Sequence, residues 1–203
     1  MKRNTLMKLL GSFAVLGAAA SITGLGTFAT FTSSTSASQS IASGTVSINL
    51  GAIGAANRLT IGAANLVAGD TVQRAVDLIN SGTGTSDPLG SIQLTTSASP
   101  SSGLDTDAVT GLQMAIDKCS VAWTESGPPY TYTCSGTATT VLTTRAVIGV
   151  NLALSNLSAL TTGSTDHLHV TLTLPAAAPN ALQGQTSGIS YTFAGTQRAA
   201  ASK

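Results

Sequence analysis

Charged side chains are scarce in this chain of 203 residues, because only 8% of them are Asp, Glu, Lys or Arg. An average soluble protein has roughly a quarter. Three of the nine basic residues, Lys2, Arg3 and Lys8, stand at the N-terminus. No basic patch is present that would hold nucleic acid through its phosphates, so we expect no nucleic-acid partner. The other basic residues are interpreted as single solvated charges: Arg58, Arg74, Lys118, Arg145, Arg198 and Lys203.

Signatures of enzymes are also missing. The sequence has no HExxH zinc-protease motif and no GxSxG nucleophile elbow, and we expect no cofactor. The only histidines, His167 and His169, have a spacing that can supply two ligands to zinc or copper, and they are weak metal candidates. The opposite face of their segment is apolar, so we expect both imidazoles to face solvent. Asp105-Thr106-Asp107 is interpreted as a solvated turn and Gly82-Thr83-Gly84 as a flexible loop.

Cysteine is limited to Cys119 and Cys134. In an exported chain two thiols oxidise, so the pair predicts one intrachain disulfide. Between them, Gly127-Pro128-Pro129 is flanked by aromatic and apolar residues, which indicates a hairpin whose arms the disulfide ties. Trp123 is then a packing ring of the core or the hairpin.

The N-terminus has the order of an export signal. Basic residues precede an apolar run over residues 9–28, and small residues follow it. We therefore divide the chain into a signal peptide at 1–29, an extended arm at 30–43 and a folded domain at 44–203. If the leader were not cut, its apolar run would be the chain's only contact with a membrane.

Beyond the leader, apolar residues recur with a period of two and turn-forming residues separate the runs, which predicts strands. The clearest strand spans residues 167–174, with leucine and valine on one face, and it stops at Pro175. Only Val141 to Leu160 is ambiguous, and there we expect irregular structure with one helical turn. The predicted fold class is all-β, an antiparallel jelly-roll or immunoglobulin-like β-sandwich preceded by the signal helix.

Four sequence blocks resemble the TasA and camelysin family of exported bacterial proteins: residues 24–32, 43–50, 65–74 and 168–197. The first block looks like the family's cleavage region and places the cut at Ala29 and Thr30. The resemblance implies a jelly-roll domain whose leader is removed by a dedicated signal peptidase. In fibre-forming relatives the arm after the cut fills a groove in the next subunit. Phe31 and Ile41 would be its plugs here.

The function that this resemblance implies is a secreted structural subunit of a cell-surface or biofilm-matrix fibre, assembling with copies of itself. Two alternatives stay open. The family label camelysin denotes a metalloendopeptidase, for which His167 and His169 are the only candidate ligands. A retained leader would instead make the chain a membrane-anchored adhesion domain at the cell surface.

Overall fold

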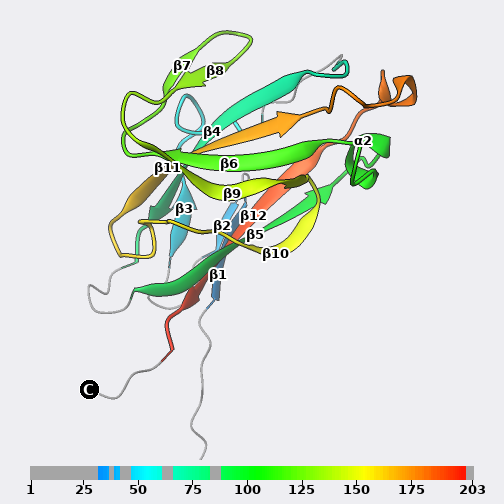
Figure 1. Cartoon of the computed structure of the whole chain (residues 1–203). Coiled ribbons are helices and arrows are strands. Elements are labelled where there is room, and N and C mark those ends of the chain that lie inside the picture. The colour runs from blue at the N-terminus through cyan, green and yellow to red at the C-terminus, as the bar shows by residue number, and fades with distance from the viewer. Residues whose placement is uncertain (1–31, 37–38, 42–46, 61–65, 83–87, 200–203) are drawn as a thin grey trace, which may run out of the picture. The chain divides into compact units, whose positions relative to one another are not determined.

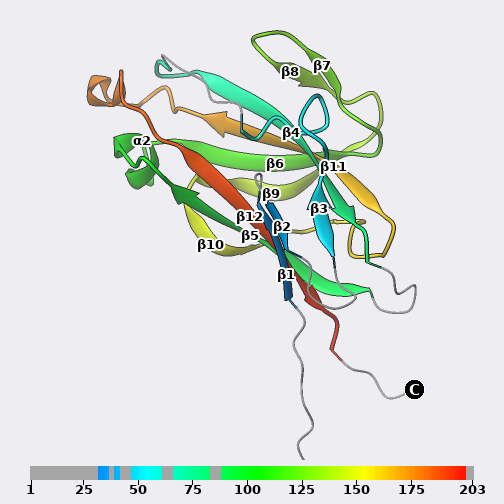
Figure 2. The same cartoon turned by 180° about the vertical axis from the view of Figure 1, so that it is seen from behind.

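The computed structural model describes residues 32–36, 39–41, 47–60, 66–82 and 88–199. Over these residues its regular secondary structure is almost entirely antiparallel strands, in two five-stranded sheets, which lie face to face, and a separate two-stranded hairpin (Figures 1 and 2). The predicted antiparallel β-sandwich is therefore confirmed. The predicted signal helix at 1–29 lies outside the described residues.

The two sheets are named after features that matter below. The arm sheet has the order β10 (Gly149–Ala153), β5 (Leu89–Ala98), β12 (Ile189–Gln197), β1 (Thr32–Ser36) and β2 (Gln39–Ile41). The histidine sheet has the order β3 (Ile48–Leu50), β4 (Thr71–Asn80), β11 (Thr165–Thr173), β6 (Gln113–Cys119) and β9 (Ala138–Ala146). The hairpin consists of β7 (Thr124–Ser126) and β8 (Thr131–Thr133). Two short helical turns, α2 (Gly103–Thr106) and η1 (Asn180–Leu182), lie in the connections.

The core lies between the two sheets, because every second side chain of the long strands points inward. Phe193 of β12 is paired with Leu94 of β5 in the arm sheet, and Leu168 of β11 with Val76 of β4 in the histidine sheet. All four side chains are fully buried. In these four strands the period-two pattern of the sequence therefore specifies which face is buried.

Charge is divided unequally between the sheets. The strands of the arm sheet contain no Asp, Glu, Lys, Arg or His. Neighbouring strands β5 and β12 instead carry paired hydroxyl residues, such as Ser97 with Ser190 and Thr95 with Thr192. The strands of the histidine sheet carry Arg74, Asp77, Asp117, Lys118, Arg145, Asp166, His167 and His169.

The prediction of irregular structure and a helical turn between Val141 and Leu160 is wrong, because β9 and β10 occupy much of this stretch. Each strand contains an irregularity that interrupts its alternation. In β9, Val141 and Leu142 are both buried where the register with β6 shifts. In β10, Asn151 adopts a φ of 53° where the register with β5 shifts. Bulges of this kind remove the period-two signal that identified the other strands.

The interpretation of Asp105 as part of a solvated turn is also wrong. This side chain is only 6% exposed and forms a capping box with Ser102 at the start of α2. Burial alone would raise its pKa, but hydrogen bonds from Ser187, Ser102 and Ser101 together lower it. Its carboxylate thereby joins α2 to the loop that precedes β12.

The predicted arm is extended where it is described. The five residues of β1 pair antiparallel with β12 of the same chain, from Thr32 opposite Thr196 to Ser36 opposite Thr192. β2 then pairs with β1 and places Ile41 opposite Ser34. Phe31 lies outside the described residues. The arm therefore extends the arm sheet within its own chain.

Candidate functional site

The two histidines lie on the outer face of β11, at one end of the histidine sheet. His167 is directly opposite Asp77 of β4, and its Nδ1 lies 2.7 Å from Asp77 Oδ1. The side chains of this pair are about a quarter exposed. The sequence did not predict this partner, because 90 residues separate the two positions and only the pairing of β4 with β11 brings them together.

The expectation that both histidines face solvent is wrong for His169, which is only 8% exposed. The ring of Trp123 lies 4.6 Å from the His169 ring and that of Tyr132 lies 5.4 Å away, measured between centroids. Burial lowers the pKa of His169, although Asp117, its cross-strand neighbour on β6, opposes this shift. On the opposite face of β11, Leu168 and Val170 are buried in the core as expected, and Asp166 lies at its end. On the polar face, the segment that contains the β7–β8 hairpin covers His169 through Trp123 and Tyr132.

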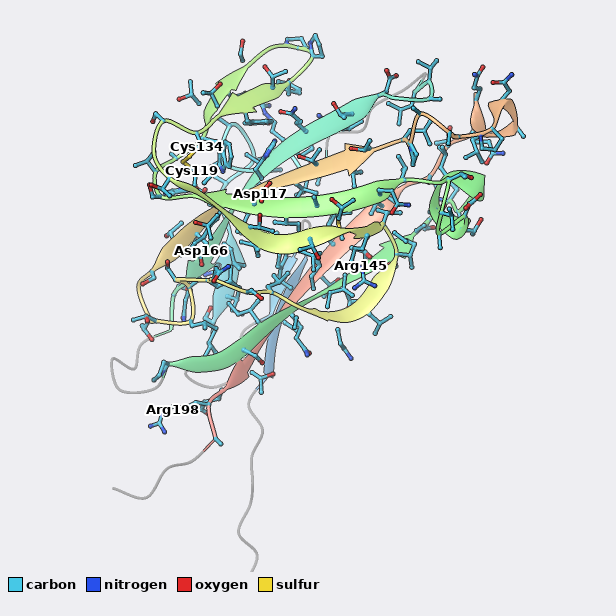
Figure 3. All side chains as sticks on the ribbon, viewed as in Figure 1. Asp117, Cys119, Cys134, Arg145, Asp166 and Arg198 are labelled. Atoms are coloured by element: carbon cyan, nitrogen blue, oxygen red, sulfur yellow. A yellow bond between two sulfur atoms is a disulfide. The ribbon has the colours of Figure 1, made fainter. Side chains whose placement is uncertain are left out.

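The hairpin is fixed to the sheet at several points. The predicted disulfide joins Cys119, at the end of β6, to Cys134, just after β8, with 5.7 Å between their Cα atoms. Figure 3 shows the two cysteines at the base of the hairpin. Trp123 Nε1 donates a 2.8 Å hydrogen bond to the carbonyl oxygen of His167. Trp123 was predicted to be a packing ring of the core or the hairpin, and it packs on the hairpin side of the sheet, against His169.

An ion pair holds the other side of the hairpin. Arg58 donates two hydrogen bonds, of 2.8 and 2.6 Å, to the two carboxylate oxygens of Glu125 in β7. The Tyr132 hydroxyl donates a 2.8 Å hydrogen bond to the same carboxylate. The Arg58 guanidinium also lies 4.6 Å from the centre of the Tyr130 ring, and that of Arg74 lies 5.6 Å from it. The hydrogen bond from Arg58 lowers the pKa of Glu125.

Three basic residues interpreted as solvated single charges therefore have partners. Arg58 binds Glu125, Arg74 is buried against the Tyr130 ring and Lys118 pairs with Asp166. The interpretation failed because each partner lies far away along the chain or on a neighbouring strand. Only the fold brings the opposite charges together.

Asp166 points to the inner face of the sandwich, away from the adjacent histidine face, and is only 2% exposed. Lys118 Nζ donates to Asp166 Oδ1 at 2.9 Å, and Lys118 also donates to Ser158. The backbone N–H groups of Ser158 and Ala159 donate to the two Asp166 oxygens at 3.0 and 2.7 Å. A pocket of about 240 Å³ opens beside this pair, lined largely by hydroxyls: Ser120, Thr137, Thr139, Ser158 and Thr165.

The comparison with known families identifies the chain. A family model described as camelysin metallo-endopeptidase matches residues 5–112, just over half of the sequence. The chain belongs to the camelysin family. This confirms the resemblance inferred from the sequence blocks. The matched part of this camelysin-family chain ends before β6, so the cysteines, the hairpin and both histidines lie beyond it. No curated protein and no solved structure matches the chain significantly.

The family's description implies a metal ion, and the histidine face tests whether this chain fits one. Within the described ranges, no three His, Cys, Asp or Glu side chains are grouped so that they can hold a metal. His167 Nδ1 faces Asp77, while His169 Nε2 is buried under the hairpin without a hydrogen-bond partner. The weak metal candidates therefore do not form a metal site in this arrangement.

Among the described residues, no helix has both the length and the apolar character needed to span a bilayer.

Proposed function

We propose that this camelysin-family chain is a secreted structural subunit of a bacterial cell surface or biofilm matrix, which assembles by exchanging residues 30–43 between copies. The observation that carries the proposal is the backbone pairing of β1 with β12 in the arm sheet. Membership of the camelysin family and the all-β fold support it.

The pairing suits exchange for a physical reason. The β1 sequence Thr-Ser-Ser-Thr-Ser has only small hydroxyl side chains, so its ladder with β12 rests on main-chain hydrogen bonds. A second copy carries the same strand, and its β1 can occupy the same place beside β12. A copy whose own arm has left would expose a row of unpaired N–H and C=O groups on β12. That edge favours capture of another arm.

Cysteines placed across the β1–β12 pairing test the exchange. Ser34 is opposite Ala194, so we expect Ser34→Cys and Ala194→Cys chains, when co-expressed, to form disulfide-linked dimers in assembled material. The matched control is Ser33→Cys with Ala194→Cys, because adjacent residues of a strand point to opposite faces and should not cross-link. Electron microscopy and light scattering should show that deletion of residues 30–43 abolishes assembly. Monomers without interchain disulfides, unchanged by the deletion, would contradict the proposal.

The proposal includes export and processing. A signal peptidase would remove residues 1–29, and the product would remain outside the cell. Mass spectrometry of extracellular protein is expected to give Thr30 as its first residue. An intact leader on that protein would instead favour the anchored adhesion domain.

The family's description favours a second candidate, a secreted metalloendopeptidase. A casein assay with and without a chelator tests this activity, and the His167→Ala, His169→Ala double variant tests the histidines. Chelator-sensitive cleavage that is absent in the double variant would assign the activity to this face. Cleavage that is the same in both chains would place it elsewhere.

A further inference from the structure

The surroundings of the His169 ring favour the neutral imidazole over the protonated one. Its ring lies against Trp123 and Tyr132, and both belong to the segment between the two cysteines. Its Nε2 atom is buried and has no hydrogen-bond partner. A protonated ring has N–H donors on both nitrogens, and an unpartnered buried donor is unfavourable. A proton on Nε2 therefore needs water, which the hairpin excludes.

Few charges face this ring from the elements that pack around it. On β6 the cross-strand neighbour is Asp117, which also accepts a hydrogen bond from Thr140 of β9. On β4 the neighbour is Ala75, and Asp77 is engaged with His167. The hairpin contributes Tyr132, Tyr130 and Glu125, and the hydroxyl of Tyr132 donates to Glu125. The cations at the far side of the hairpin, Arg58 and Arg74, lie against Tyr130. Asp117 is thus the only carboxylate among these groups that directly favours a proton on His169, and burial outweighs it.

We propose that the β7–β8 hairpin is an acid-released cover, which leaves the histidine sheet when His169 is protonated and stays attached through the Cys119–Cys134 disulfide. Release exposes Trp123 and Tyr132 and hydrates His169. The disulfide lies at the base of the hairpin and is unaffected by mild acid, so the cover closes again when the proton is lost.

The direction of the pH dependence follows from proton linkage. Covering His169 lowers its pKa below its ordinary value of about 6.5, so the open form binds the proton more tightly than the covered form. The closed state therefore has its full stability relative to the open state above pH ~6.5. As the pH falls below this value, the ratio of closed to open molecules decreases by at most about tenfold per pH unit. Glu125 has a lowered pKa and keeps its charge in mild acid. Between pH 6.5 and 5, protonation can therefore change the charge of His169 while the Arg58–Glu125 ion pair stays charged.

Trp123 reports the movement, because it is the only tryptophan in the chain. Between pH 7.5 and 5 we expect a reversible red shift of its emission and greater quenching by acrylamide, both beginning below pH ~6.5. In His169→Phe the ring contact is kept and the titrating group is lost, so the emission should not shift over this range. His167→Gln is the matched control and should behave like the unaltered chain, because its ring faces Asp77.

Two fluorescence results would overturn the proposal. One is an unaltered chain whose Trp123 emission stays constant down to pH 5. The other is a His169→Phe variant that shifts as the unaltered chain does. If this variant does not fold, NMR of the unaltered chain decides the matter. The His169 Cε1 signal and the Trp123 indole N–H signal must then titrate with one midpoint, and separate midpoints reject the cover.

Discussion

Replacing Asp166 with alanine should lower the free energy of unfolding by about 3–5 kcal/mol, the usual effect of removing one partner of a buried ion pair. The Asp166 side chain is 2% exposed and accepts from Lys118 and from the backbone of Ser158 and Ala159. Without it, the ammonium group and two backbone donors lose their acceptor at the end of the core. Chemical denaturation of the purified chain measures the loss.

Two further variants separate charge from shape at this position. Asp166→Asn keeps the shape and one acceptor oxygen, so it should cost less than Asp166→Ala. A double variant, Lys118→Met with Asp166→Leu, removes both charges and should recover part of the loss, since a buried pair replaced by apolar groups is often neutral. A loss below about 1 kcal/mol in Asp166→Ala, the range of exposed pairs, would mean that the pair is solvated.

Removal of the disulfide in Cys119→Ala, Cys134→Ala should lower the free energy of unfolding by about 3 kcal/mol, the value for closure of a loop of this length. The cysteines are 15 residues apart, and the hairpin lies between them. Without the disulfide, the unfolded chain gains conformational entropy. In the folded state, the segment that contains Trp123 is no longer tied covalently to the end of β6. Denaturation with tryptophan emission as the signal measures both effects.

The unaltered chain, reduced and alkylated, provides a comparison that changes no residue. It should lose stability to the same extent as the double variant if the covalent link is responsible. A difference of less than 1 kcal/mol between the oxidised chain and both altered forms would show that the hairpin contacts alone hold this region.

The sandwich was predictable because its strands alternate. In β11, Leu168 and Val170 face the core, and the sequence alone predicted this strand. The strand ends at Thr173, shortly before the stop predicted at Pro175. The disulfide was predictable from the cysteine count together with the predicted export signal. The strands β9 and β10 were missed because bulges disturb their alternation at Val141 and Asn151.

The candidate site was only half predictable, because it depends on contacts that no local pattern encodes. The sequence placed His167 and His169 on one face of a strand, which is correct. It gave no sign that Trp123 and Tyr132 would cover His169, since the same residues also suit a hairpin that stands in water. Arg58 and Glu125 are 67 positions apart, and their pairing became visible only with the fold.

The composition of the arm sheet has a consequence for the proposed exchange of arms between copies of the chain. Since its strands bear no Asp, Glu, Lys, Arg or His, no charged side chain of these strands attracts or repels an approaching arm at the edge offered by β12. Salt screens interactions between charges and leaves main-chain pairing largely untouched. The arm exchange proposed above should therefore proceed at nearly the same rate in dilute buffer and in concentrated salt.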